Sequence, residues 1–231
     1  GEIALWQIHP SGNVTLKKEI IADSRYDFRR LQIDAERKGL IALSYSGQIL
    51  YIDSLFHTTQ IDLNLVAPIG IEYLSDAWVV ACKSGEIFKI SLTNGSSALL
   101  YKHPHAITTF AKSRQEIILG DSQGGLFRLN PDGTTLELWK GIRQPITAIY
   151  KDQGIFALGY ENGRIIIGNL EKGTMEELVG HLSRITCLQL VNKRLFTSSY
   201  DGTVRLWNLD KDNKVGSFVV AEQKNWIYVF R

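Results

Sequence analysis

Short hydrophobic runs recur along this chain at fixed distances after a glycine. Five of these glycines are separated by 38, 39, 39 and 39 residues, and a sixth precedes them by 46 residues: Gly1, Gly47, Gly85, Gly124, Gly163 and Gly202. The second residue after each glycine is Ile, Leu or Val, and the sixth is small or polar. This pattern predicts a tight turn that leads into a strand ending at the surface. Because the interval is nearly constant, the chain is an array of one repeated unit.

The recurring glycine is expected in the turn of a β-hairpin. Turn dipeptides of the Ser-Gly, Asn-Gly or Asp-Gly type stand at residues 46–47, 84–85, 162–163 and 201–202. In such pairs glycine tolerates positive φ, and the polar neighbour can bond nearby backbone amides. Each pair therefore joins two strands.

Four short strands per unit follow when the sequence is read outward from these turns. In the last complete unit they cover residues 185–190, 194–199, 203–208 and 215–220, and the first strands of earlier units cover residues 28–33, 69–74, 107–111 and 146–150. No window of 12 or more residues shows helical periodicity with caps. Four strands in about 40 residues are typical of a propeller blade, so the predicted fold is all-β.

One unit resembles a WD40 repeat closely. It contains Gly180-His181 and then, at residues 195–208, the segment LFTSSYDGTVRLWN, which ends in Trp-Asn where the WD40 repeat has Trp-Asp. Elsewhere the resemblance is partial, because Lys102-His103 and Lys140-Gly141 keep only part of the Gly-His pair and Gly168 replaces the Trp. The spacing extends the resemblance over nearly the whole chain. It implies a WD40-type β-propeller of five complete four-stranded blades plus an incomplete blade from the two termini.

The expected organisation is a single β-propeller domain over residues 1–231. Its units cover approximately residues 1–23 (partial), 24–62, 63–101, 102–140, 141–179, 180–220 and 221–231 (partial). Because propeller units pack on their neighbours in a ring, residues 2–20 and 226–230 are expected side by side in one incomplete blade. The second strand of that blade is missing, which indicates either a piece of a longer ring or a ring whose sixth blade closes imperfectly. WD40 rings most often have seven blades.

Composition favours a soluble cytoplasmic domain. The chain is 44% hydrophobic and 22% charged, with a formal net charge of +2, so it can bury a core and gives no reason to expect nucleic acid as a partner. No stretch approaches the roughly 20 apolar residues that span a membrane. Cys82 and Cys187 fall inside strand patterns, so we expect two buried free thiols.

Residues suited to catalysis or metal binding are few. His103 and His105 lack a Cys or carboxylate cluster at ligand spacing, so the first is interpreted as a remnant of the Gly-His pair and the second as a solvated neighbour. Asp121, Asp132 and Glu161 are interpreted as loop carboxylates that nothing pairs as acid and base. We therefore expect no catalytic residue, no cofactor and no metal, and the chain is predicted not to be an enzyme.

The best-defined group of polar residues is His181, Thr197, Asp201 and Trp207. The WD40 resemblance implies a hydrogen-bonded chain in which the indole N–H donates to the hydroxyl, the hydroxyl contacts the imidazole, and the carboxylate holds the other ring nitrogen. A Thr, a His and an Asp also suggest a catalytic triad. A hydroxyl tied to a buried Trp cannot reach a substrate, so a structural role is predicted.

The same resemblance implies a set of partner-binding residues. In WD40 proteins, partners contact the positions three and five after the Gly-His histidine and the residue before the turn Asp. Carried over, these are Arg184, Thr186, Tyr200, Trp226, Tyr228, Asp27, Arg29, Tyr45, Lys83, Thr108, Ser122, Thr147 and Glu161. The assignments in the first two complete units depend on an alignment that a deletion can shift by one residue.

Two functions of different classes follow. The favoured one is a non-catalytic protein-interaction scaffold or sensor module that binds a protein or peptide partner through the propeller rim. Similar arrays often occur in larger bacterial multidomain signalling proteins, so other domains of the same parent chain are also candidate partners. The alternative is a small-ligand-binding or enzymatic propeller that uses the central channel, which would need convergent carboxylates, His or metal ligands at its mouth.

Overall fold

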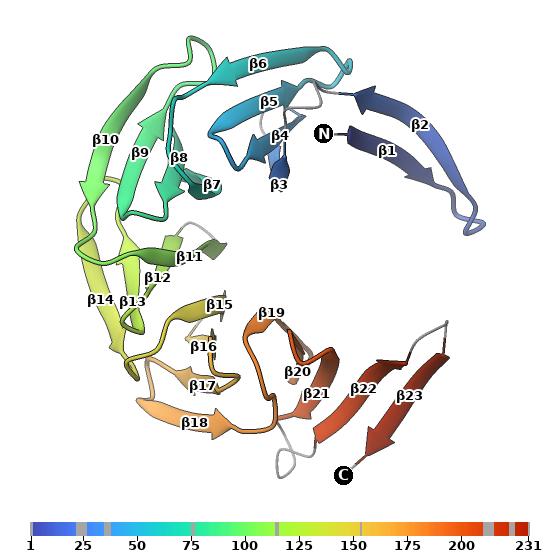
Figure 1. The fold of residues 1–231 in the computed structure, drawn as a ribbon, viewed down its shortest axis with the longest axis vertical. Helices are drawn as coiled ribbons and strands as arrows, with labels where there is room; N and C mark the ends of the chain where they lie inside the picture. The colour runs from blue at the N-terminus through green and yellow to red at the C-terminus, as the bar shows by residue number, and fades with distance from the viewer. Residues whose placement is uncertain are drawn as a thin grey trace.

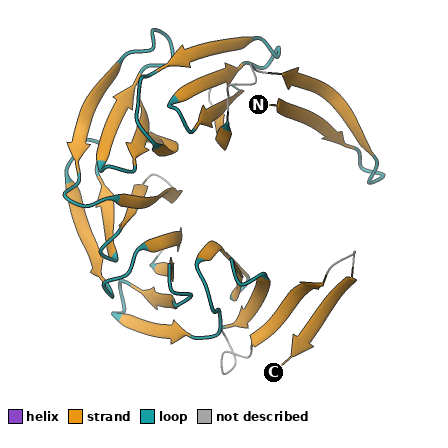
Figure 2. Cartoon of the chain, viewed as in Figure 1, coloured by secondary structure: helices purple, strands orange, loops and turns teal. Residues whose placement is uncertain are grey.

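The computed structural model describes residues 2–21, 27–34, 38–74, 77–113, 116–152, 154–209, 215–221 and 225–230. These residues form strands and connecting turns (Figure 2). No helix occurs among them, so the described part of the chain offers no helical segment that could cross a membrane.

Each complete repeat contributes four strands to an antiparallel sheet, and these strands pair in sequence order; the fifth sheet has one strand more. We call these sheets the first to fifth blades. The first blade contains β3 (Phe28–Asp34), β4 (Gly39–Ser44), β5 (Gln48–Ile52) and β6 (Thr58–Asp62). The second contains β7 (Pro68–Leu74), β8 (Ala77–Cys82), β9 (Glu86–Ile90) and β10 (Ser97–Lys102).

The remaining blades follow the same order. The third blade contains β11 (Ile107–Ser113), β12 (Glu116–Asp121), β13 (Gly125–Leu129) and β14 (Thr135–Lys140). The fourth contains β15 (Ile146–Asp152), β16 (Ile155–Tyr160), β17 (Ile165–Asn169) and β18 (Thr174–Leu178). The fifth contains β19 (Ile185–Val191), β20 (Arg194–Ser199), β21 (Thr203–Asn208) and β22 (Val215–Ala221).

The blades are arranged around an open arc, with the first strand of each toward the middle and the fourth toward the outside (Figure 1). The second strands are packed between neighbouring blades, and every residue of β8 is buried. The outer strands are exposed, as in β18, where Leu178 is the buried residue. The hydrophobic core therefore lies between the blades, which is why the apolar runs recur with the repeat.

The repeated glycine has positive φ in the turn of all five blades, and in the first four it also lies against the backbone of the next blade. Gly124 has a φ of +85°, and a Cβ added there would lie 1.9 Å from the backbone oxygen of Ile142 in the next unit. Gly163 has the same φ, and its added Cβ would lie 2.6 Å from the backbone oxygen of His181. A side chain at either position would be strained and would push two blades apart. This explains the regular spacing of the glycines.

The two ends of the chain do not form one blade, so that expectation was wrong. β1 (Glu2–Ile8) and β2 (Val14–Ile21) pair only with each other, and β23 (Asn225–Phe230) pairs with β22 as a fifth strand of the fifth sheet. The ends lie on opposite sides of the opening in Figure 1. Only three residues separate β22 from β23, and a short loop costs little entropy to close, so the local hairpin is favoured over a distant pairing.

Candidate partner-binding rim

One end of the blades is marked by a backbone hydrogen bond that recurs in all five. The residue before the turn donates its N–H to the carbonyl of a residue just before the first strand. The pairs are Tyr45 to Asp27 (3.0 Å), Lys83 to Ala67 (3.0 Å), Ser122 to Ala106 (2.9 Å), Glu161 to Pro145 (3.0 Å) and Tyr200 to Arg184 (2.9 Å). We call these ten residues the rim. The repeated bond shows that Asp27, Tyr45 and Lys83 are aligned with the fifth blade without a shift.

A β-bulge follows the rim in the first strand of every blade. The register shifts between Phe28 and Arg30, Pro68 and Gly70, Ile107 and Thr109, Ile146 and Ala148, and Ile185 and Cys187. A bulge leaves one residue out of the ladder and re-aims its neighbours. The residue at the bulge is the predicted contact position five after the histidine, namely Arg29, Thr108, Thr147 or Thr186 in the blades where one was assigned.

The bulge threonines of the third and fourth blades bind the next blade. Thr108 Oγ1 lies 2.6 Å from the backbone oxygen of Ile146, and Thr147 Oγ1 lies 2.6 Å from that of Ile185. Each hydroxyl also approaches a carbonyl of its own blade, at 3.1 and 3.2 Å. These hydroxyl hydrogens are therefore used between blades. Thr186 instead contacts the hydroxyl of Ser198, at 2.7 Å, and is exposed.

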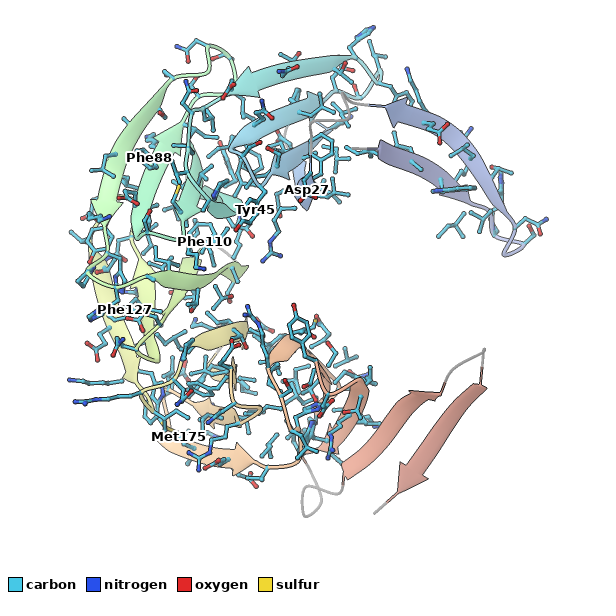
Figure 3. All side chains as sticks on the ribbon, viewed as in Figure 1. Asp27, Tyr45, Phe88, Phe110, Phe127 and Met175 are labelled. Atoms are coloured by element: carbon cyan, nitrogen blue, oxygen red, sulfur yellow. The ribbon has the colours of Figure 1, made fainter. Side chains whose placement is uncertain are left out.

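A cavity of about 680 Å³ lies against the rim and takes residues from all five blades. Seven of the residues assigned from the sequence line it: Tyr45, Lys83, Thr108, Ser122, Glu161, Arg184 and Tyr200. Asp27, which lies with Tyr45 in the inner part of the first blade (Figure 3), is exposed and does not line the cavity. Thr147 and Thr186 also lie outside the lining. The side chains of Arg29, Trp226 and Tyr228 fall outside the described residues. Most of the described residues that were assigned from the sequence therefore line the same cavity.

Arg184 connects the fourth and fifth blades at this cavity. Its Nη1 lies 3.2 Å from Glu161 Oε2, and its Cζ lies 5.9 Å from the centroid of the Tyr200 ring. The side chains of Arg184 and Glu161 are 39% and 46% exposed, and Tyr200 is 73% exposed. An ion pair this exposed contributes only about 0–1 kcal/mol, so the guanidinium is oriented without being strongly held.

Arg30 is a cavity residue that the sequence did not reveal. It is the residue after the bulge, equivalent by register to Gly70, Thr109, Ala148 and Cys187 in the other blades. Four of these five positions hold a small side chain, and of the five only Arg30 lines the cavity. In an alignment of the five first strands, Arg30 stands at a position where the other blades have a small residue. This alignment can be made only once the position of the bulge is known.

His181, Thr197, Asp201 and Trp207, which we call the tetrad, make the contacts that the resemblance to a WD40 repeat implies. Trp207 Nε1 donates to Thr197 Oγ1 at 3.0 Å, Thr197 Oγ1 lies 2.7 Å from His181 Nε2, and His181 Nδ1 lies 2.8 Å from Asp201 Oδ2. Thr203 donates its hydroxyl to Asp201 Oδ1 at 2.6 Å. The Trp207 and Thr197 side chains are buried, so the hydroxyl faces protein atoms rather than a substrate.

Burial and hydrogen bonding together set the charges in this network. It lowers the pKa of His181 below its ordinary value, although the hydrogen bond to Asp201 opposes the shift. Burial alone would raise the pKa of Asp201, but hydrogen bonds from Thr203, the Leu182 backbone N–H and His181 outweigh it and lower that pKa. A neutral imidazole and a carboxylate result. The imidazole then donates from Nδ1 and accepts at Nε2.

A second buried His–Asp pair lies in the third blade. His103 Nε2 is 3.1 Å from Asp121 Oδ2, and both side chains are almost fully buried. Asp121 also accepts the backbone N–H groups of Gln123 and Gly125. Burial favours a raised pKa for Asp121, but these hydrogen bonds lower it. The expectation that Asp121 lies in a loop was wrong, since it is the last residue of β12; His105 is exposed, as expected.

The cysteines differ from each other. Cys82 is a buried free thiol, as predicted, whereas Cys187 is free but exposed. Cys187 directly follows the bulge of β19 and is equivalent to Arg30, which lines the cavity. The expectation that both thiols are buried was wrong. The equivalent positions of the second, third and fourth blades, Gly70, Thr109 and Ala148, are buried, whereas among the described residues no further blade packs against β19.

Comparisons with known proteins agree with this architecture. No family model matches the chain. It is 27% identical over 130 residues to the mouse WD repeat-containing protein 54, covering 51% of this chain and 39% of that protein, and the rat WD repeat domain 54 protein matches equally. The fold is a WD40-type β-propeller. A Neurospora crassa protein named as a probable E3 ubiquitin ligase complex SCF subunit, scon-2, is 31% identical over 87 residues, 36% of this propeller chain.

The extent of these matches is partial. The propeller chain spans 39% of the length of the mouse relative and 12% of that of scon-2. Among solved structures, the computationally designed Ika8 protein matches with a TM-score of 0.64 and 20% identity, covering 89% of this chain and 71% of that one. The designed Ika4 protein matches with a TM-score of 0.53 and 22% identity, over 62% and 91%. At these identities the two designed proteins support the fold alone.

Proposed function

We propose that this propeller is a non-catalytic protein-interaction scaffold that binds a protein or peptide partner at the rim cavity. The observation that carries the proposal is convergence: seven residues assigned one blade at a time from the sequence line one cavity. WD-repeat proteins, which are the distant relatives of this chain, in general mediate protein–protein contacts. A cytoplasmic location and a place in a larger signalling protein stay predictions.

The side chains at the cavity are suited to protein binding. Tyr200 is a large, exposed aromatic residue beside Arg184, and Tyr45 enters the same cavity from the first blade. Tyr and Arg dominate binding energy at interfaces, because each combines a large contact area with directed hydrogen bonds. Their spread over several blades favours a partner segment that crosses the channel mouth.

The volume of the cavity also supports a second candidate function, the binding of a small molecule. A cavity of about 680 Å³ falls within the range of roughly 300–1,000 Å³ that is typical of small-molecule sites. A small ligand at the channel mouth would contact the same residues. The two functions therefore need an experiment that recovers either kind of partner.

Affinity capture from a lysate tests both functions. The bait is the chain, compared with its Arg184→Glu/Tyr200→Ala variant and with Arg194→Glu, whose side chain is exposed at the opposite end of β20. The proposal expects proteins that the wild type and Arg194→Glu retain and the double variant loses. Equal recovery by all three baits would place binding elsewhere. Retention of a small metabolite without a protein would support the second function instead.

A further inference from the structure

We infer that the rim cavity recognises an acidic segment of its partner, with Arg184 pairing with a partner carboxylate; this inference rests on the proposed function. Three cationic residues, Arg30, Lys83 and Arg184, line the cavity. Among the described lining residues, Glu161 alone is acidic. The cavity thus carries an excess of positive charge contributed by three different blades, and this charge favours a negatively charged ligand.

The contact between Arg184 and Glu161 shows how an acidic side chain is held here. Glu161 Oε2 approaches one guanidinium nitrogen, Nη1, at 3.2 Å. An Arg side chain has five N–H donors arranged to bind a carboxylate with two parallel hydrogen bonds, so this single contact leaves donors for a second carboxylate. Glu161 therefore acts as an internal competitor. Its weak, exposed pairing is easily exchanged for a partner carboxylate.

The other lining residues favour a peptide over a nucleic acid. Besides the cations, the lining includes Ala67, Pro68, Ile69, Ala106 and Pro145, together with two tyrosines. A lining that combines apolar and aromatic groups with a few charges suits a chain of mixed acidic and apolar side chains. The net charge of the whole chain is only +2, which is not the extended basic surface that phosphate backbones require.

A random dodecapeptide phage library, selected on the chain at low salt, tests the inference with peptides of every charge. We expect peptides enriched in Asp and Glu beside apolar residues. The best peptide is then synthesised with its key Glu kept, or replaced by Gln, Lys or phosphoserine, and titrated by fluorescence anisotropy. Replacement by Gln is expected to weaken binding at least about tenfold, and Lys more. Tighter binding by phosphoserine than by Glu would overturn the assignment to a carboxylate.

Three variants test which residues cause the preference for acidic peptides. Arg184→Gln should weaken the Glu peptide about tenfold or more, and should reduce the difference between the Glu and Gln peptides. Glu161→Gln should tighten binding, because it removes both a competitor and a like charge. Arg194→Gln is the control and should bind as the wild type. Weaker binding by Glu161→Gln, or enrichment of neutral or basic peptides, would overturn the inference.

Two different results would distinguish a loss of the acidic specificity from a loss of the rim as the binding surface. Peptides that bind with no charge preference, and that lose binding on Tyr200→Ala, would leave the rim as the binding surface and remove the acidic specificity. Absence of any peptide that depends on Tyr200 or Arg184 would overturn both.

Discussion

The indole N–H of Trp207 donates to Thr197 Oγ1 across 3.0 Å, and each of these side chains is only 1% exposed. The same hydroxyl contacts His181, so one oxygen atom links two buried rings. In the third blade, the corresponding positions are Leu119 and Leu129, and both are buried. A blade can therefore be built without this network, and its contribution to stability is open to measurement.

Removing one member of the network should destabilise the propeller. Thr197→Ala or Trp207→Phe is expected to lower the free energy of unfolding by about 1–3 kcal/mol, since each leaves buried polar groups unpaired. Equilibrium urea denaturation measures this. Thr186→Ala, which removes an exposed hydroxyl, is the control and should cost about 0.5 kcal/mol or less. Wild-type midpoints for both tetrad variants would contradict the predicted structural role.

Acidification should weaken the folded state through His181. Its folded pKa lies below the ordinary value of 6.5, so the unfolded chain takes up the proton more readily. The contribution to stability is therefore complete above about pH 6.5 and is lost as the pH falls through the folded pKa. Asp201, whose pKa is also lowered, contributes above 3.8 and loses its contribution at lower pH.

Denaturation of the wild type and of His181→Gln at pH 7.5 and 5.5 tests this prediction. The other histidines are present in both proteins, so the difference between the two isolates the imidazole at this site. We expect the wild type to lose more stability than the variant between these pH values. An equal loss would show that His181 does not titrate differently on unfolding.

The hydroxyl of Thr147 should stabilise the contact between the fourth and fifth blades. Thr147→Val keeps the shape of the side chain but leaves the Ile185 carbonyl without its 2.6 Å donor, at an expected cost of about 1 kcal/mol. The matched control is Thr186→Val, at the same position of the fifth blade, where the hydroxyl contacts another hydroxyl instead. Comparable losses for both variants in thermal unfolding would assign the effect to strand propensity rather than to the contact between blades.

The two thiols should react at very different rates. Burial, reinforced by the charge of Glu86, raises the pKa of Cys82 to about 11, so the thiolate is scarce as well as inaccessible. Cys187 is exposed. Brief treatment with iodoacetamide at pH 7.5, followed by mass spectrometry, should show alkylation of Cys187 alone, and of both thiols in urea. Early alkylation of Cys82 in the folded protein would show that the second blade opens.

The parts of the fold that were predictable depend on local constraints. A turn that needs positive φ and close contact with the next blade requires glycine, so Gly124 and Gly163 could be located from spacing alone. The rim residues followed because each holds a constant distance from such a turn. Asp121 could not be placed, since a carboxylate beside a turn looks the same in sequence whether it is exposed or bonded to His103.

The wrong predictions arise where the regular repeat spacing is overridden by another structural feature, such as a β-bulge or a short connecting loop. Arg30 was missed because the bulge adds one residue to the first strand and changes which side chain faces the cavity. The exposure of Cys187 was missed because the same position is buried in the second, third and fourth blades, each of which is followed by another blade. The pairing of β23 was missed because periodicity assigned it to a new unit. A three-residue connection makes the local hairpin the cheaper arrangement in chain entropy.

Three of the hydrogen bonds between blades join positions that are 38 residues apart: Thr108 with Ile146, Ser113 with Lys151, and Thr147 with Ile185. Each donor therefore meets an acceptor at nearly the same place in the following copy. Inserting or deleting one whole blade would keep such equivalent backbone positions opposite each other, whereas losing a fragment of a blade would shift every position across that junction. A length change of one whole blade is therefore expected to disturb these contacts less than a partial one.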